Sequence, residues 1–299
     1  MAVSSNKFVA KEWLLSDPES AFTSVVEFMD TFQDARIDGK EQYHLVFAKQ
    51  MVLTNIFTSN KLEGTLSSSL SHSDTYGLLG SLYDDVDKDK LDVPPIHWKA
   101  DGDGDAKATR FQLACHLDAV LYMTSEDMIT RDLDVDDVLT VHRLMMKNAT
   151  EKDGTFLRSG DFHNVDVRAG EHLYPPGNPG ALREACEKIV AEFNSSLGAE
   201  GKCFIEVTSK LFYDMITLHP FSDGNGRFCR LLVTYALRRA GFPFSIPLSS
   251  HHKKSRNHYM LAILECRCTG KMQQLNSLIL TSMNYVMRNY SDNVRVMNV

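Results

Sequence analysis

HPFSDGNGRFCR, residues 219–230, interrupts the helical pattern of this chain and decides how the rest of it is interpreted. Apolar side chains recur at three- and four-residue spacing in residues 204–218 and again after residue 227, which predicts a helix on each side. The junction is therefore a glycine-containing loop that leads into a helix N-terminus. Backbone N–H groups at such an N-terminus lack helical partners, and together with the helix dipole they favour a bound phosphate.

Four side chains of this segment add chemistry to phosphate binding. His219 has an imidazole that can accept a proton near neutral pH, and Asp223 offers the oxygen ligand that Mg²⁺ prefers. Arg227 and Arg230 lie three residues apart on the following helix, so they point to similar sides and could hold the outer phosphates of a triphosphate. The segment therefore predicts a catalytic nucleotide site.

The same segment resembles the signature of the Fic family, and every position that the family specifies is present. The resemblance implies that His219 is the general base for an acceptor hydroxyl and that Asp223 coordinates Mg²⁺, or Mn²⁺, on the phosphates of ATP. It implies an anion hole made of three residues, Gly224, Asn225 and Gly226. Arg227 would contact the β-phosphate and Arg230 the γ-phosphate, while Phe221 packs beneath the loop. The implied reaction is the transfer of AMP from ATP to a Ser, Thr or Tyr hydroxyl of a protein.

A second motif, Ser59 to Gly64 (SNKLEG), resembles the inhibitory motif of the Fic class that carries its inhibitory helix before the catalytic loop. By itself, a serine four residues before a glutamate near a helix end is commonly a solvated face. Beside the loop, the pattern indicates that the Glu63 carboxylate binds Arg230 and competes with ATP. If that contact contributes roughly 1.5–3 kcal/mol, its removal raises nucleotide binding about 10- to 150-fold. Relatives with such a glutamate also hydrolyse the AMP–protein bond, which makes de-AMPylation a second expected activity.

The fold expected from these patterns is all-α, a Fic-type helical bundle with one small β-hairpin over the active site. The N-terminal region, residues 1–106, would contain the inhibitory helix, about 41–64, with Gly64 as its stop, and an acidic insertion, about 65–106. The catalytic core would span 107–290, and 291–299 would be a tail. Asp134 or Asp136 could cap one core helix. The resemblance to the family covers roughly residues 51–280.

The hairpin, about residues 162–173, has Gly170 as its predicted turn residue. In the family it is a flap over the site, and its exposed strand edge can add a segment of the protein substrate by backbone pairing. Further along, Tyr259 resembles the aromatic wall beside the adenine. An Asn often found seven residues after that Tyr is Cys266 here, so adenine preference rests on the resemblance alone.

Other candidate ligand sites in the sequence are weaker. A calcium loop counted from Asp101 fails, because Ala106 and Gln112 stand where Gly and Glu are required, so a solvated acidic loop is expected. The six cysteines include only a C-x-C at Cys266 and Cys268, and we expect reduced thiols and no zinc. His116 and His142 lie on helical faces and are interpreted as core or capping residues without a functional role.

The amino-acid composition and charge of the chain argue against some classes of binding partner. The 299 residues are 43% hydrophobic and carry a formal charge of −7, which argues against nucleic acid as the main partner. No apolar run approaches the roughly 18 residues needed to span a bilayer, and no secretory signal opens the sequence. We therefore expect a cytoplasmic protein without a membrane partner, and a nuclear location is not excluded.

Alternatives remain open for both activity and assembly. Related Fic enzymes use other nucleotide or phosphodiester donors, although the intact Gly226 disfavours the phosphate-transferring branch. A different class of protein would bind ATP as a sensor or scaffold, held off by Glu63, and would transfer nothing when Glu63 is removed. Members of the family often form dimers, and the sequence neither supports nor excludes a homodimer.

Overall fold

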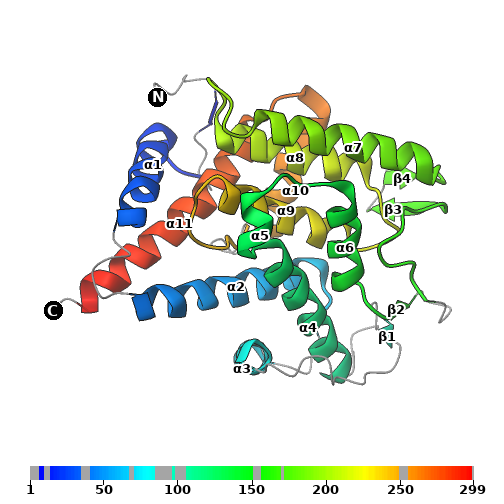
Figure 1. The fold of residues 1–299 in the computed structure, drawn as a ribbon, viewed down its shortest axis with the longest axis horizontal. Coiled ribbons are helices and arrows are strands. Elements are labelled where there is room, and N and C mark those ends of the chain that lie inside the picture. Colours follow the sequence, from blue (N-terminus) through cyan, green and yellow to red (C-terminus); the bar gives the residue numbers. More distant parts are fainter. Residues whose placement is uncertain are drawn as a thin grey trace.

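A computed structural model describes residues 7–9, 14–34, 41–66, 71–84, 96–97, 106–150, 156–169, 172–248 and 255–297. These residues form a helical bundle with two very short strand pairs (Figure 1). In chain order the elements are α1 (Pro18–Asp34), α2 (Glu41–Glu63), α3 (His72–Asp84), β1 (Ile96–His97), α4 (Ala106–Met123), α5 (Glu126–Thr130), α6 (Val135–Met145), β2 (Ala149–Thr150), β3 (Val167–Ala169), β4 (His172–Tyr174), α7 (Pro179–Ser196), α8 (Phe204–Leu218), α9 (Asn225–Arg239), α10 (Ser255–Thr269) and α11 (Gln273–Met297).

Helix α9 is the centre of the bundle. It packs against α8 and also contacts α2, α4, α5 and α6. Residues 227–237 are buried on every side of the helix, which is the pattern of a helix enclosed by others. Among the described residues, no helix is both long and apolar enough to cross a membrane. The central position of α9 places its N-terminus, and the 219–224 loop before it, where α2, α4 and α6 converge.

The helix expected at about 41–64 is α2, and it contacts α4, which runs at a steep angle to it (Figure 1), and α9. It ends at Glu63 because Gly64 adopts the left-handed conformation, with φ of 67°, as the stop signal predicted. The next segment differs from the exposed insertion expected there, since residues 72–84 form α3. Its Leu79 and Leu82, three residues apart on one helix face, are almost fully buried. The DGDGD segment lies outside the described residues.

The C-terminal helix α11 contacts α1, α8 and α10. Residues 291–297, expected to be a tail, instead continue α11, because no glycine or proline follows Gly270 to end the helix. Near this end, Tyr290 meets Phe47 of α2 and Phe244 edge-on or tilted, at centroid distances of 5.3 and 5.2 Å. This aromatic contact fixes the first half of α2 to the C-terminal helix.

The hairpin is β3 and β4, antiparallel, with Val167 opposite Tyr174. Gly170, its predicted turn residue, lies outside the described residues. A second pair was not predicted: Ile96 of β1 lies opposite Ala149 of β2 in parallel register. With helices as the main elements and one antiparallel hairpin, the predicted all-α fold class is confirmed.

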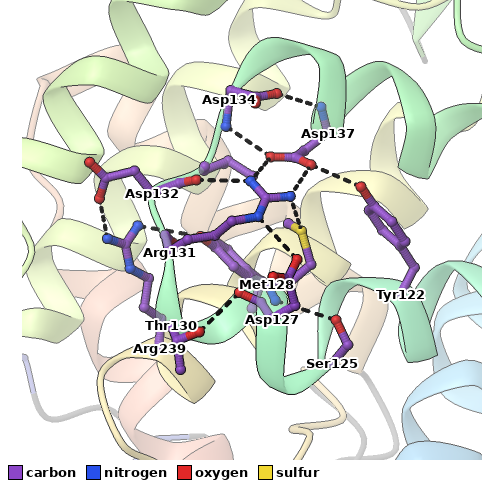
Figure 2. Close-up of polar contacts among 12 residues, drawn as sticks. Tyr122, Ser125, Asp127, Met128, Thr130, Arg131, Asp132, Asp134, Asp137 and Arg239 are labelled. Carbon is purple, nitrogen blue, oxygen red and sulfur yellow. Dashed lines mark hydrogen bonds and ion pairs between the residues drawn. The ribbon is translucent and has the colours of Figure 1, made fainter.

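A charged network holds the start of α6 against its neighbours (Figure 2). Asp134 caps the helix, as one of the two predicted candidates, and forms a capping box with Asp137. Asp137 also accepts two hydrogen bonds from Arg131, of 2.6 and 2.7 Å, and one from Tyr122 of α4. Burial alone would raise the pKa of Asp137, but these hydrogen bonds hold that pKa below its usual range. The network fixes α6, which lies beneath the loop.

Candidate functional site

The 219–224 loop is bounded by two residues in the left-handed backbone conformation. His219 ends α8 with φ of 52°, and its N–H donates to the carbonyl of Met215. Gly224 precedes α9 with φ of 78°, and a Cβ there would lie 2.8 Å from the Met146 sulfur, so glycine is required. A histidine at positive φ is unfavourable, and such strain is concentrated at functional sites.

Asn225 closes the loop with its own side chain. Its Oδ1 accepts a hydrogen bond of 3.1 Å from the Phe221 N–H, and its Nδ2 donates to the Phe221 carbonyl at 2.7 Å. Both amide atoms are thus engaged with the Phe221 backbone, and the residue is 2% exposed. If Asn225 contributes to an anion hole, it does so through its backbone N–H.

The His219 imidazole is neutral, as a group that accepts a proton must be. Its side chain is 8% exposed, and burial lowers the pKa of the imidazole to about 4. The imidazole is therefore neutral at pH 7. Nδ1 lies 3.4 Å from the Ile216 carbonyl, an arrangement that suits a proton on Nδ1 and leaves Nε2 to accept one.

Asp223 is the predicted metal ligand. Its Oδ1 accepts a 2.7 Å hydrogen bond from the Gly224 N–H, which fixes the carboxylate at the start of α9. No group of three or more His, Cys, Asp or Glu side chains suited to a metal occurs among the described residues. A single carboxylate beside a phosphate site fits Mg²⁺, since this ion commonly takes one or two carboxylates and completes its shell with phosphate and water.

Arg230 binds the motif at the end of α2. Its Nε donates to the Ser59 hydroxyl at 2.9 Å, and its Nη2 donates to the Ser59 carbonyl at 3.1 Å and to Glu63 Oε1 at 2.6 Å. The expected contact between Glu63 and Arg230 is therefore present. Burial alone would raise the pKa of the Glu63 carboxyl, but the Arg230 guanidinium holds that pKa below its usual range.

The Glu63 carboxylate also lies over the first turn of α9. A Cβ built on Gly226 would approach Glu63 Oε1 to 2.4 Å, a separation that no real contact allows. Glycine at this position is thus what admits the carboxylate to the helix N-terminus. A negative group of the protein occupies the place where the helix N-terminus and Arg230 would attract an anion.

The remaining predicted residues lie around these groups. Arg227 is buried, with Nη2 3.4 Å from the Met146 sulfur. Tyr259 of α10 is 5% exposed, and its hydroxyl lies 3.5 Å from Arg230 Nη1. Cys266, where the resemblance suggested Asn, is 1% exposed, so the thiol belongs to the core.

Two histidines that had been assigned no role make contacts at the site. His142 of α6 accepts a 2.8 Å hydrogen bond from the Gly160 N–H, and its Nε2 lies 3.0 Å from the Asp223 carbonyl. Its ring stacks on Phe221 at 3.7 Å. His116 of α4 is paired with Asn60 of α2 at 2.9 Å. Both are core residues, as expected, but His142 supports the loop and His116 the end of α2. Helical periodicity in the sequence predicts that these two residues face the core, but it does not predict which residues they contact.

Part of this chain is similar to known proteins. Residues 132–237 match the Fic/DOC family. A protein adenylyltransferase Fic from Culex quinquefasciatus is 30% identical over 151 residues, which are 49% of this chain and 28% of that protein. A Fido domain-containing protein from Dictyostelium discoideum is 26% identical over 143 residues, 48% of this chain and 99% of that protein. This chain thus spans less than a third of the Culex relative.

Among solved structures, a Fic domain containing signaling protein from Bacteroides thetaiotaomicron is similar with a TM-score of 0.63 and 19% identity. The similarity covers 91% of this chain and 94% of that one. At this identity the similarity concerns the fold, and it covers more of the chain than residues 132–237.

Proposed function

This chain belongs to the Fic/DOC family, and from that premise we propose that it transfers AMP from ATP to a protein hydroxyl and that Glu63 restrains the transfer. The observation that carries the proposal is the position of the Glu63 carboxylate, over the first turn of α9 and bound to Arg230. A carboxylate held by a helix N-terminus and an arginine marks a site built for a phosphate. The neutral His219 at the other end of the same loop supplies a base.

In the proposed reaction, His219 Nε2 accepts the proton of the acceptor hydroxyl. The hydroxyl oxygen attacks the α-phosphorus, the bond from that phosphorus to the β-phosphate oxygen breaks, and pyrophosphate leaves. The N–H groups of the first turn of α9 point away from the helix and stabilise the charge that develops on the α-phosphate oxygens. Arg227 and Arg230 hold the outer phosphates, and Asp223 would hold Mg²⁺, which offsets phosphate charge.

The brake follows from the place that the Glu63 carboxylate occupies, over the first turn of α9 and against the Arg230 guanidinium. Arg230 is 2% exposed, so a phosphate that approaches its guanidinium from the helix N-terminus meets this carboxylate. A γ-phosphate must therefore replace the Glu63 carboxylate before ATP can bind in the productive position. We propose hydrolysis of the AMP–protein bond as a second activity, in which the same carboxylate orients a water molecule.

We propose that the protein substrate binds along the flap, residues 162–173. Among the described residues the sheet of β3 and β4 has two strands, so each strand has one edge without a described partner strand. Backbone hydrogen bonds along such an edge would place a hydroxyl of the substrate beside His219, and they would not depend on the identity of the neighbouring substrate side chains.

The test uses Glu63→Gly with Mg²⁺ and ATP labelled on either the α- or the γ-phosphate. Transfer of AMP predicts label on protein from α-labelled ATP alone, together with released pyrophosphate. Label from the γ-position would show phosphate transfer instead. ATP binding without any label on this chain or on proteins of a lysate would refute transfer and favour a sensor.

A further inference from the structure

Tyr174, the last residue of β4, covers the imidazole of His219. The two rings stack with centroids 4.2 Å apart and planes inclined by 13°. The hydrogen-bond contact of this imidazole is weak, because the Nδ1 distance to the Ile216 carbonyl is 3.4 Å. A base must hold its ring in one orientation to reach its proton, and the stacked aromatic face contributes to that restraint.

Tyr174 is itself held from three directions. Val167 of β3 lies opposite it in the hairpin, and the His172 ring meets it edge-on at 4.5 Å. Arg267 of α10 donates a 3.2 Å hydrogen bond from Nη2 to the Tyr174 hydroxyl. Pro175 follows directly and favours extended backbone at Tyr174.

We propose that Tyr174 is a positioning residue for His219 and that Arg267 in turn holds Tyr174. The proposal deepens the proposed function and rests on it for the role of His219 as base. The stacked phenol fixes the plane of the imidazole and shields it from water. After proton uptake, the same electron-rich face stabilises the imidazolium.

This role differs from one in which Tyr174 itself receives AMP. A positioning residue acts through its ring, so Tyr174→Phe keeps the function and Tyr174→Leu loses it. An acceptor acts through its hydroxyl, so Tyr174→Phe would abolish labelling.

The kinetic test measures self-labelling with α-labelled ATP in the Glu63→Gly background. Tyr174→Phe should retain the rate within about 3-fold. Tyr174→Leu should lower the maximal rate on the order of 10-fold, since a lost aromatic pair and a misplaced base both act on the transfer step. The ATP concentration for half-maximal rate should stay within about 2-fold, because Tyr174 does not hold the phosphates.

Arg267 is tested by a double-mutant cycle. Arg267→Ala should match Tyr174→Phe, and adding it to Tyr174→Phe should cause no further loss, because both changes remove the same hydrogen bond. Additive losses from the two changes would show that Arg267 acts elsewhere.

A second readout does not need transfer activity. In protein with ¹³C,¹⁵N-labelled histidine, the His219 imidazole resonance, assigned with His219→Ala, should carry a ring-current shift from Tyr174. Tyr174→Leu should remove the shift, whereas Leu173→Ala, on the same strand and with a side chain 51% exposed, should leave it. A resonance that moves while no variant transfers label would support the stack and refute the proposed function. A Leu variant with unchanged rate and unchanged resonance would overturn the proposal.

Discussion

Removing the charge of Glu63 should raise the affinity for Mg²⁺–ATP. The carboxylate makes one charge-assisted hydrogen bond of 2.6 Å to a buried guanidinium, a type of contact that contributes about 1.5–3 kcal/mol. Because the Glu63 side chain is 35% exposed, water screens part of this energy, and the lower half of the range applies. Glu63→Gln should therefore tighten binding on the order of 10- to 40-fold.

Isothermal titration calorimetry with Mg²⁺–ATP measures this change directly. Glu187→Gln is the matched control, because Glu187 pairs with Arg183 on the exposed face of α7 and its loss should leave the dissociation constant within about 2-fold. Glu63→Gly should bind at least as tightly as Glu63→Gln, since it removes the side chain as well as the charge. Equal affinity in the wild type and both Glu63 variants would refute competition between the carboxylate and ATP.

Three further changes test the supports of the site. In the Glu63→Gly background, His142→Phe keeps an aromatic ring but removes the hydrogen bonds to the Asp223 carbonyl and from the Gly160 N–H. The labelling rate should fall about 10-fold or more, because the loop loses its support. Thermal unfolding checks that the variant is folded. Asp137→Asn should lower the free energy of unfolding by about 1–3 kcal/mol, measured by urea denaturation, and an unchanged midpoint would contradict the network. Because the pKa of His219 is lowered to about 4, kcat/KM should show no loss from pH 7 down to about 5, whereas a half-loss at pH 6–7 would indicate an ordinary imidazole.

Much of the site could be predicted because its groups are close in sequence. The 219–230 segment contains the base, the predicted metal ligand and both arginines, and helix periodicity on each side places them at one junction. The contact between Glu63 and Arg230 was also predicted, from the resemblance of residues 59–64 to the inhibitory motif of the family and from the opposite charges of the two side chains. The functional roles of these residues stay predictions.

The supports of the site could not be predicted in the same way. His142 and Asp223 are 81 positions apart, and a buried histidine on a helix face has the same local pattern whether or not it meets a loop. Asn225 was predicted only as a member of the anion hole, and the two hydrogen bonds of its side chain to the Phe221 backbone could not be predicted, because they depend on the path of the loop. Helix α3 was concealed by the Ser- and Asp-rich residues around it, although Leu79 and Leu82 carried its buried face.

The roles of Glu63 and His219 are tested together by comparing Glu63→Gly with Glu63→Gly combined with His219→Ala, using α-labelled ATP and Mg²⁺. We expect strong labelling in the first variant and loss of labelling in the second. The dissociation constant for ATP should be the same within about 2-fold, because His219 acts on the acceptor hydroxyl and not on the phosphates. Equal labelling in the two variants would contradict His219 as the base.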